Sequence, residues 1–443
     1  MLYCTIDEVN PGDIVAASVL HPKRDDVELL SRGFQLDGRT VSRLKQLGIT
    51  RLWVDHDAAA DLDRVIDPAI GGSRRRLCTA MGEAFNQAAA SSLSADGAVE
   101  LRRVVMELIC EVAANRKLAA LSQQMLGSGG DLFTHGSGVA YLAIVLGTEL
   151  ESYIVQERSR LNAARACDLT GLGVGALLHD VGKLPDPSPR HDPASPARQD
   201  AARGAAGRTP TAAAAKQTHV TEVPVDRWAG GDADDSRVAD YLEHPARGFA
   251  RLKGSRVAAS ATQIILSHHR LFDGRGFPDL GADARTPGEG NPAGRSLHVF
   301  SRIAAVANVL DGLLRRFPHR PAINALSALR SSAFAGWFDP VVLDTALRRL
   351  PPFAMGSRVV LSDGEPAVVI APSMLQPCRP TVRLLGESKR NADGSYPTID
   401  LREKRQLHIA ETEGADVSGL LFEMPEEPPA SVRVGRHPQY HAA

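Results

Sequence analysis

The segment Leu177-Leu178-His179-Asp180-Val181-Gly182-Lys183 places a histidine beside a carboxylate where an apolar run ends. The apolar residues from Ala163 to Val181 recur at helical spacing, so this segment is predicted to end a core helix. A carboxylate buried there has to be paired with a cation or bound to a metal, because burying an isolated charge is costly. Taken alone, the pair fits a satisfied buried polar pair as well as it fits two metal ligands.

Other His-Asp pairs occur in the chain, so the pair alone is not diagnostic. His56-Asp57 and His191-Asp192 lie in polar or proline-rich stretches and are interpreted as solvated. The metal interpretation gains support from a second concentration of ligand types, His268-His269, which is followed by the loop Asp273 to Pro278.

Further ligand types stand at the ends of predicted helices. His135 is expected near the start of one, with Asp131 one turn earlier on the same face, and His244 precedes Pro245, which is expected in the first turn of another. Asn308 and Asp311 share a helix face. These ends are expected to converge on one cleft. Imidazoles combined with carboxylates suit manganese, iron or zinc better than magnesium or calcium.

Two metals about 3.5–4 Å apart, bridged by Asp180, would account for so many ligands and would ionise a shared water near neutral pH, as phosphodiester hydrolysis requires. Lys183 is placed to meet the charge on phosphoryl oxygens, although an ordinary solvated lysine at a helix end is the common alternative. The loop containing Gly274, Gly276 and Phe277 would let backbone approach a ligand and a ring stack on a base. A plain turn is the alternative for this loop.

Composition narrows the class of protein. A length of 443 residues allows two to four domains at roughly 100–200 residues each. The net charge of -1 disfavours a general binder of nucleic-acid polymers. The five cysteines form no C-x-x-C pair, which is typical of reduced thiols. No basic leader and no apolar run of about 18 residues occurs, so we expect a cytoplasmic protein without membrane insertion.

The periodicity divides the chain into parts of different style. The parts are a small α+β module at 1–66, a helical connector at 67–125, a helical domain at 126–350, a β-rich domain at 351–412 and a disordered tail at 413–443. Within the first module, a helix is predicted from Val41 to Leu47, with Thr40 as its N-cap. Residues of about 186–240 bury little apolar surface and are expected to form a mobile insertion. In the β-rich part, Ser357 to Leu361 and Ala367 to Ile370 are predicted to pair as a hairpin.

The chain resembles the HD-GYP branch of the HD phosphohydrolase superfamily, bacterial enzymes that hydrolyse cyclic di-GMP. The motifs that carry the resemblance are His135, HDVGK at 179–183, His244-Pro245, HHRLFDGRGFP at 268–278 and RIAAVANVLDGLL at 302–314. The first 66 residues are similar to a module often found ahead of such domains, and the region after 351 to a β-rich extension behind some of them. The resemblance implies a multidomain protein whose all-α HD-type domain is a metal-dependent phosphohydrolase.

The resemblance also implies cofactors, substrate and site residues. It implies two divalent metal ions, or three as in trinuclear members, most often iron or manganese, and cyclic di-GMP hydrolysed to pGpG or GMP in second-messenger signalling, with signalling proteins as further partners. The implied metal ligands are His135, His179, Asp180, His244, His268, His269, Asn308 and Asp131. Asp180 and Lys183 are the implied catalytic residues. Implied substrate contacts are Lys183, Gly276, Phe277, Pro278, Arg316 and Arg320.

Several positions depart from the family pattern. Asn308 stands where the family has its last aspartate ligand, Arg270 where a glutamate follows the paired histidines, Phe277 replaces the tyrosine of G-Y-P, and Phe317 replaces an arginine. Loss of support around a ligand typically costs about 10–100-fold in metal affinity or activity. The first hypothesis is therefore a cyclic di-GMP phosphodiesterase, attenuated by Asn308, Arg270 and Phe317, whereas Phe277 keeps the stacking face and is a mild change. The alternatives are a catalytically degenerate regulator that binds a nucleotide or a partner, and a phosphohydrolase for another nucleotide.

Overall fold

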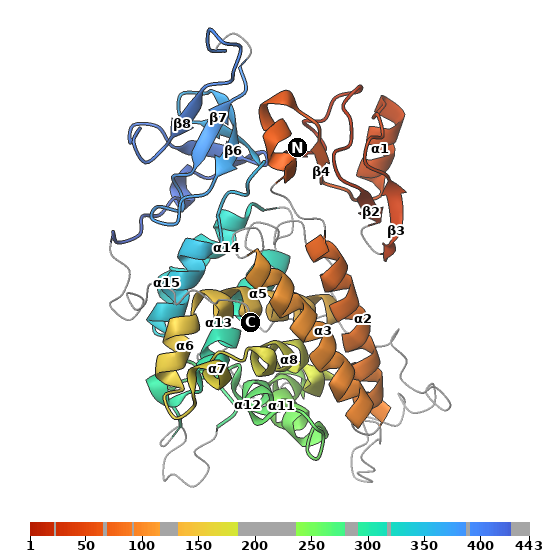
Figure 1. Ribbon diagram of the computed structural model, residues 1–443, viewed down its shortest axis with the longest axis vertical. Coiled ribbons are helices and arrows are strands. Elements are labelled where there is room, and N and C mark those ends of the chain that lie inside the picture. Colours follow the sequence, from red (N-terminus) through yellow and green to blue (C-terminus); the bar gives the residue numbers. More distant parts are fainter. Residues whose placement is uncertain are drawn as a thin grey trace, which may run out of the picture.

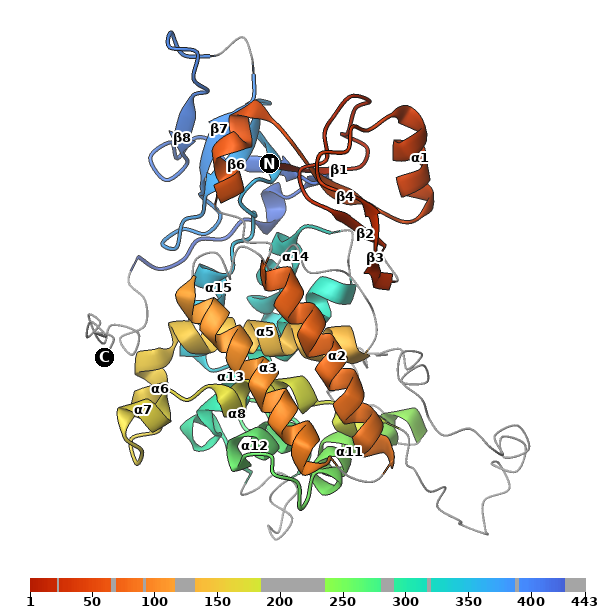
Figure 2. The ribbon, with the colours of Figure 1, turned by 45° about the vertical axis from the view of Figure 1, so that its right-hand side comes forward.

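The computed structural model describes residues 1–21, 24–64, 69–90, 93–115, 132–184, 236–279, 291–316, 320–386 and 390–426. Figures 1 and 2 show a helical domain at one end, with the N-terminal module and the β-rich domain side by side at the other. Asp131, Phe317, the expected tail from 427 onward and the expected insertion up to residue 235 lie outside the described residues. Residues 236–240, also assigned to the insertion, instead begin a helix.

The N-terminal module consists of two small antiparallel pairs of strands, one α-helix and one 3-10 helix. Strand β1 (Leu2–Thr5) pairs with β4 (Arg51–Val54), β2 (Val19–His21) pairs with β3 (Arg24–Leu30), and the helices are α1 (Gly38–Gln46) and the 3-10 helix η1 (Asp57–Arg64). The prediction of Thr40 as N-cap is wrong. Asp37 caps α1, because its carboxylate accepts the backbone N–H of Thr40 at 2.6 Å, and the helix therefore starts one turn earlier. Gly48, at φ +82°, follows the helix end as predicted.

The helical domain is built around two almost completely buried helices, α5 (Leu132–Glu149) and α8 (Thr170–Leu178). Glycines on α8 allow close packing: a Cβ on Gly175 would lie 2.9 Å from the Cα of Ala261 in α12. The other helices of this domain are α2 (Ala69–Ala90), α3 (Ala95–Ala114), α6 (Glu151–Glu157), α7 (Ala163–Ala166), α11 (Ser236–Arg251), α12 (Ala259–Ser267), α13 (Val299–Arg316), α14 (Ala322–Leu329) and α15 (Pro340–Arg349), with 3-10 helices η3 (Val181–Lys183), η6 (Gly294–Ser296) and η7 (Ser332–Phe334).

Two expectations for this domain need correction. The single helix predicted from Ala163 to Val181 is divided into α7 and α8, because the carboxylate of Asp168 accepts the backbone N–H of Thr170 at 2.9 Å and competes with a continuous helix. The helices α2 and α3 were assigned to a connector at 67–125, separate from the helical domain, but both pack into the same hydrophobic core as α5 and α8; for α3, the apolar spacing from Val99 to Ala114 already indicated a core helix. Phe85 of α2, for example, lies with its ring centroid 5.5 Å from that of Phe133 in α5.

The β-rich domain is one antiparallel sheet with the strand order β10-β9-β5-β6-β7-β8. Its strands are β5 (Arg358–Leu361), β6 (Pro366–Ala371), β7 (Thr381–Leu384), β8 (Thr398–Asp400), β9 (Ile409–Thr412) and β10 (Ala415–Asp416). The hairpin of β5 and β6 is present as predicted. The prediction of a disordered tail from 413 is wrong up to residue 426, because β10 and the 3-10 helix η9 (Ser418–Leu420) follow and the side chains of Val417, Phe422 and Met424 are buried.

The N-terminal module contacts the β-rich domain through backbone and charge. The backbone N–H of Tyr3 donates to the carbonyl of Gly356 at 2.7 Å, and the largely buried side chains of Arg51 and Glu413 form an ion pair at 2.6 Å.

Within the described ranges, no single helix has the length and hydropathy needed to cross a membrane. The helices α5 and α6 reach that threshold only as a pair, which bends by 84° at the break.

Candidate metal centre

Six buried side chains from four helical regions converge inside the helical domain. The first turn of α5, the end of α8, the middle of α11 and the end of α12 each contribute at least one. These side chains are His135, His179, Asp180, His244, His268 and His269, and each is at most 6% exposed. The structure therefore brings together the six ligand candidates that come from the three His-containing motifs and from His135.

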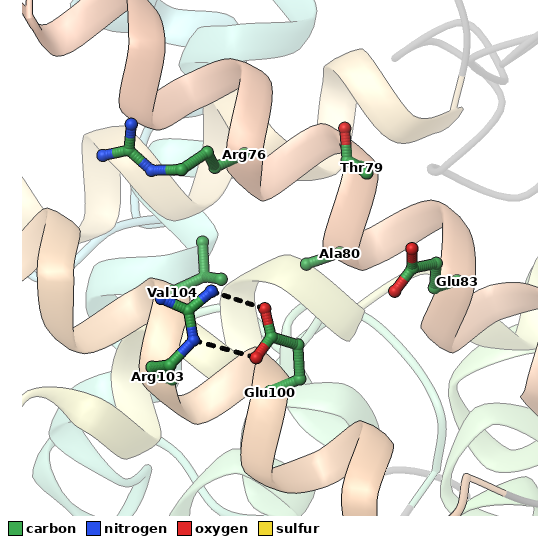
Figure 3. A pocket seen from close by; sticks show the side chains of 7 residues that line it. All are labelled: Arg76, Thr79, Ala80, Glu83, Glu100, Arg103 and Val104. Carbon is green, nitrogen blue, oxygen red and sulfur yellow. Dashed lines mark hydrogen bonds and ion pairs between the residues drawn. The ribbon is translucent and has the colours of Figure 1, made fainter.

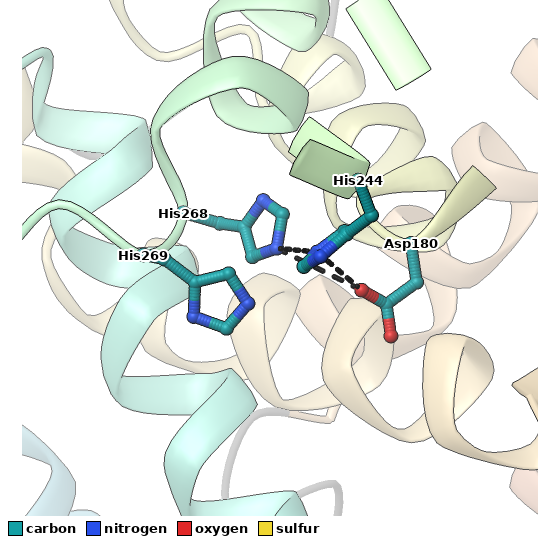
Figure 4. A group of neighbouring side chains, drawn as sticks. All are labelled: Asp180, His244, His268 and His269. Carbon is teal, nitrogen blue, oxygen red and sulfur yellow. Dashed lines mark hydrogen bonds and ion pairs between the residues drawn. The ribbon is translucent and has the colours of Figure 1, made fainter. Parts of the chain in front are cut away.

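Asp180 lies at the centre of this cluster, with its two carboxylate oxygens turned toward different histidines. Oδ1 lies 3.1 Å from Nε2 of His244 and 3.7 Å from Nε2 of His268, while Oδ2 lies 3.4 Å from Nε2 of His179. Figure 4 shows the side of the cluster that faces Oδ1, where dashed lines join Asp180 to His244 and His268, with His269 beside them. Two groups result that could each hold a metal ion and that share Asp180: one with His244, His268 and His269, the other with His135 and His179.

Hydrogen bonds to backbone carbonyls set the orientation of the imidazoles. Nδ1 of His179 lies 2.7 Å from the carbonyl oxygen of Ala176, and Nδ1 of His268 lies 3.0 Å from that of Ile265. A proton on Nδ1 that serves these carbonyls leaves the lone pair of Nε2 directed at the cluster, as metal ligation requires. Nε2 of His179 is buried without a hydrogen bond, a lack that a bound cation would remove.

The orientation of His244 depends on the proline that follows it. The prediction that Pro245 would begin a helix is wrong, because it lies inside α11. Proline has no N–H, so the carbonyl four residues earlier, that of Tyr241, receives no helical hydrogen bond from it. Nδ1 of His244 contacts this carbonyl instead, which leaves Nε2 for the cluster.

Close backbone contact brings α11 to the His-Asp motif. Gly182 lies in η3, directly against α11, and a Cβ at this position would lie 1.8 Å from the carbonyl oxygen of His244. A side chain larger than hydrogen would therefore push apart the segments that carry Asp180 and His244.

The charge states of the cluster suit a divalent cation. Burial lowers the pKa of His179 to about 4, and it also lowers the pKa of His244, His268 and His269. Burial alone would raise the pKa of Asp180, but the neighbouring His179, Lys183 and His244 hold it well below its usual range. Near neutral pH the imidazoles are thus neutral and the carboxylate is ionised, the forms that bind metals.

Two side chains of α13 complete the environment of His135. Oδ1 of Asn308 lies 3.0 Å from Nε2 of His135, and Oδ2 of Asp311 lies 2.7 Å from Nδ1. Burial would raise the pKa of Asp311, but Arg315 and His135 lower it to about 2. The sequence placed Asp311 on one helix face with Asn308, among the ligand types expected to converge on the cleft, but it did not predict the contact with Nδ1 of His135.

The loop after the paired histidines forms one wall beside the cluster. The ring of Phe277 stacks on that of His269, with centroids 4.4 Å apart and planes at 21°. The ring of Tyr241 lies 5.4 Å from that of Phe277, and Nζ of Lys183 lies 5.3 Å from the centre of the Tyr241 ring. We call Tyr241 and Phe277 the aromatic wall. Tyr241 is a further residue that sequence reasoning missed, and its position one turn before His244 was the available signal.

The remaining predicted site residues lie at the edge of the described structure. Gly276 and Pro278 belong to the same loop as Phe277, and Gly276 has the positive φ of +87° that favours glycine. Arg320 is exposed ahead of α14, and Arg316 is the last residue of α13, with a side chain outside the described part.

A separate surface hollow of about 410 Å³ lies between α2 and α3 (Figure 3). Its lining residues are Arg76, Thr79, Ala80, Glu83, Glu100, Arg103 and Val104. Arg103 and Glu100, both on α3, form an ion pair at 2.6 Å. This lining includes none of the six converging side chains, so the hollow is distinct from the candidate metal centre.

Comparisons with known proteins agree with this arrangement. Residues 358–413 match the family described as "KOW domain associated with HD domain". The chain is 23% identical over 401 residues to the protein named cyclic di-GMP phosphodiesterase PA4108 of Pseudomonas aeruginosa, covering 83% of this chain and 81% of that protein. It is also 33% identical over 109 residues to the cyclic di-GMP phosphodiesterase response regulator RpfG of Xanthomonas campestris pv. campestris, covering 24% of this chain and 26% of the relative.

No solved structure matches the chain. The fold has the two parts that the resemblance implied, a helical HD-type domain and a small β domain behind it. Together with the relatives, these features confirm what the motifs at 135, 179–183, 244–245, 268–278 and 302–314 predicted: the chain is an HD-GYP-like protein.

Proposed function

We propose that this protein is a metal-dependent phosphodiesterase that hydrolyses cyclic di-GMP to pGpG or GMP in bacterial second-messenger signalling. The observation that carries the proposal is the sharing of Asp180 by two buried groups of ligand atoms. Such an arrangement suits phosphodiester hydrolysis, in which two adjacent cations neutralise charge on the phosphoryl group. Both named relatives are called cyclic di-GMP phosphodiesterases, which supports the same substrate.

The donor set fits two divalent metal ions. One would be held by Asp180 with His244, His268 and His269, and the other by Asp180 with His135, His179 and the amide oxygen of Asn308. Imidazole-rich sites with carboxylates suit manganese, iron or zinc, and of these we propose manganese or iron, the metals that the family resemblance implies. When bound, these ions would supply Lewis-acid activation of the phosphoryl group and of water.

Other residues of the chain would bind and orient the substrate. The ammonium of Lys183 lies at the rim of the cluster, 18% exposed, and would neutralise a phosphate oxygen of the nucleotide. The aromatic wall beside it would stack on a guanine base, and the glycine at position 276 permits the tight turn that carries Phe277 to this wall.

Asn308 is proposed to limit the activity. Its amide oxygen is positioned like a ligand beside His135, but it carries no formal charge. Both groups share Asp180 as their one anionic member among the described ligands, but the group of His135 adds two imidazoles and this neutral amide where the other group adds three imidazoles. We therefore expect the ion next to His135 to be held more weakly than the ion next to His244.

Turnover of cyclic di-GMP by the full chain tests the proposal. The protein, stripped of metal and then reloaded with manganese or iron, is expected to release pGpG or GMP in proportion to bound metal, and chromatography of the products separates the two outcomes. Asp180→Ala is the negative control, and Asp344→Ala, which removes a buried carboxylate of α15, is the matched control. Tight binding without turnover would favour a regulator, and turnover of other nucleotides alone would favour a different phosphohydrolase.

A further inference from the structure

Arg270 occupies an unusual position for a cation, because its side chain is 3% exposed and fills the inside of the loop that follows it. Its guanidinium donates to the backbone carbonyl of Gly276 at 2.7 Å, to that of Pro278 at 3.3 Å, and to that of Gly274. These three acceptors belong to one short loop. His269 directly precedes Arg270 and Phe277 directly follows Gly276, and both belong to the candidate site.

We propose that Arg270 is a positioning residue that holds the 271–278 loop closed and thereby sets the aromatic wall against the metal cluster. This inference rests on the proposed function and specifies how the substrate side of that site is built. Arg270 touches no candidate metal ligand atom and acts only through the loop. Sequence comparison alone marks the position as a departure from the family's glutamate, whereas the contacts assign it a role.

The backbone of the loop shows why its closure matters for the site. Arg270 and Gly276 form an isolated antiparallel bridge, and the N–H of Phe277 donates to the carbonyl of His269 at 3.3 Å. A Cβ on Gly276 would lie 2.0 Å from that same carbonyl oxygen. The ring of Phe277 is thus carried over the imidazole of His269 by a tight turn in which three carbonyls, those of Gly274, Gly276 and Pro278, accept from the guanidinium.

The chemistry of the contact predicts an order among replacements. Guanidinium offers only donors, and its two terminal nitrogens, Nη1 and Nη2, serve the three loop acceptors, while Nε is buried without a hydrogen bond. Lysine would keep the charge and some donors without the planar fork, and glutamine would keep one donor group. Glutamate would set a carboxylate against three carbonyl oxygens, which repels them and leaves buried acceptors unpaired. The loop should therefore open progressively in the order Arg, Lys, Gln, Glu.

The test compares Arg270→Glu and Arg270→Lys with a control on the outside of the same loop, Arg275→Gln. The side chain of Arg275 is 62% exposed and pairs with Asp273. Hydrogen exchange reports loop closure directly through the amides of Leu271, Gly274 and Phe277, which bond within the loop. We expect these amides to exchange about tenfold faster in Arg270→Glu, by a smaller factor in Arg270→Lys, and at the native rate in the control.

The kinetic readout separates positioning from a loss of fold or of metal. With cyclic di-GMP, Arg270→Glu should raise KM by about tenfold while kcat changes less, because the wall that binds the base moves and the reacting groups stay. Metal content by elemental analysis should equal that of the native chain, because the side chain of Arg270 donates to loop carbonyls. If Arg270→Glu does not fold, Arg270→Gln carries the same measurements.

Two results would overturn the inference. One is native exchange rates in the loop of a folded Arg270→Glu variant. The other is a rise of turnover in Arg270→Glu, which would mean that the arginine merely replaced a useful glutamate. If the native chain neither binds nor hydrolyses cyclic di-GMP, the proposed function fails, and the exchange measurement still decides whether Arg270 holds the loop.

Discussion

Nδ1 of His135 lies 2.7 Å from Oδ2 of Asp311, and the guanidinium of Arg315 holds the same carboxylate from the next turn of α13. The contacts from Arg315 through Asp311 to His135 fix the proton of His135 on Nδ1 and leave Nε2 directed at Asn308 and Asp180. The ligand from α5 is therefore aligned by a charge on α13. The same pair joins the two helices that line the second ligand group.

The alignment of His135 predicts the effect of Asp311→Asn. Loss of the charged acceptor should lower metal affinity about 10–100-fold, since partners behind a ligand typically contribute that much. Metal titration followed by elemental analysis measures the change. The matched control is Asp344→Asn, because Asp344 is also a buried carboxylate paired at i,i+4 with an arginine, Arg348, at 2.8 Å. Equal metal loss in both variants would refute a specific role of Asp311.

A glycine gives an independent test of the same contact. A Cβ on Gly138 would lie 2.0 Å from Oδ1 of Asp311 and 2.8 Å from Nη2 of Arg315. Gly138→Ala should therefore displace the carboxylate, lower the melting temperature and reduce metal content. Gly82→Ala in α2 is the control, because nothing lies within 4 Å of a Cβ there. That substitution should leave metal content unchanged and stabilise the helix by up to about 1 kcal/mol.

The sharing of Asp180 predicts how ligand deletions differ. Asp180→Ala removes a ligand from both groups, whereas His244→Ala and His179→Ala each remove one ligand from one group. Elemental analysis should show both metals lost in the first variant and a partial loss in the other two. Circular dichroism should show that the helical content is kept, because the side chains face the cluster and do not fill the hydrophobic core. Full metal content in Asp180→Ala would contradict the assignment.

The sequence was sufficient to find the candidate ligands that stand in short motifs. His179 with Asp180 and His268 with His269 each end a helix whose apolar spacing is clear, so both their type and their approximate position were predictable. The helix after residue 297 was predictable for the same reason, and it carries Asn308.

Contacts between distant segments were beyond the same reasoning. His135 and Asp311 are 176 residues apart, and only the packing of α13 against α5 brings them together. The role of Arg270 depends on the direction of three loop carbonyls, which no residue type reveals. Pro245 was assigned to a helix start because proline favours that place, whereas here His244 compensates for the missing N–H inside α11.

Replacing Asn308 by aspartate tests whether the missing charge limits the protein. Oδ1 of Asn308 lies 3.0 Å from Nε2 of His135, so a carboxylate at this position would add an anionic ligand to the group of His135, His179 and Asp180. Metal occupancy of Asn308→Asp should rise, and cyclic di-GMP turnover should rise with it if that ion is the limiting one.

Thermal unfolding gives Asn308→Asp a readout that does not depend on turnover. Without metal, the new carboxylate lies near the anions Asp180 and Asp311, so their repulsion should lower the melting temperature below that of the native chain. With manganese, the order should reverse, because the ion binds the folded state more tightly and stabilises it by mass action. Asn324→Asp in α14, remote from the cluster, should show neither effect. If manganese does not change the melting temperature of Asn308→Asp, residue 308 lies outside the metal site. If metal occupancy rises and turnover does not, the low activity is caused by the substrate contacts, where Phe277 and Arg270 lie.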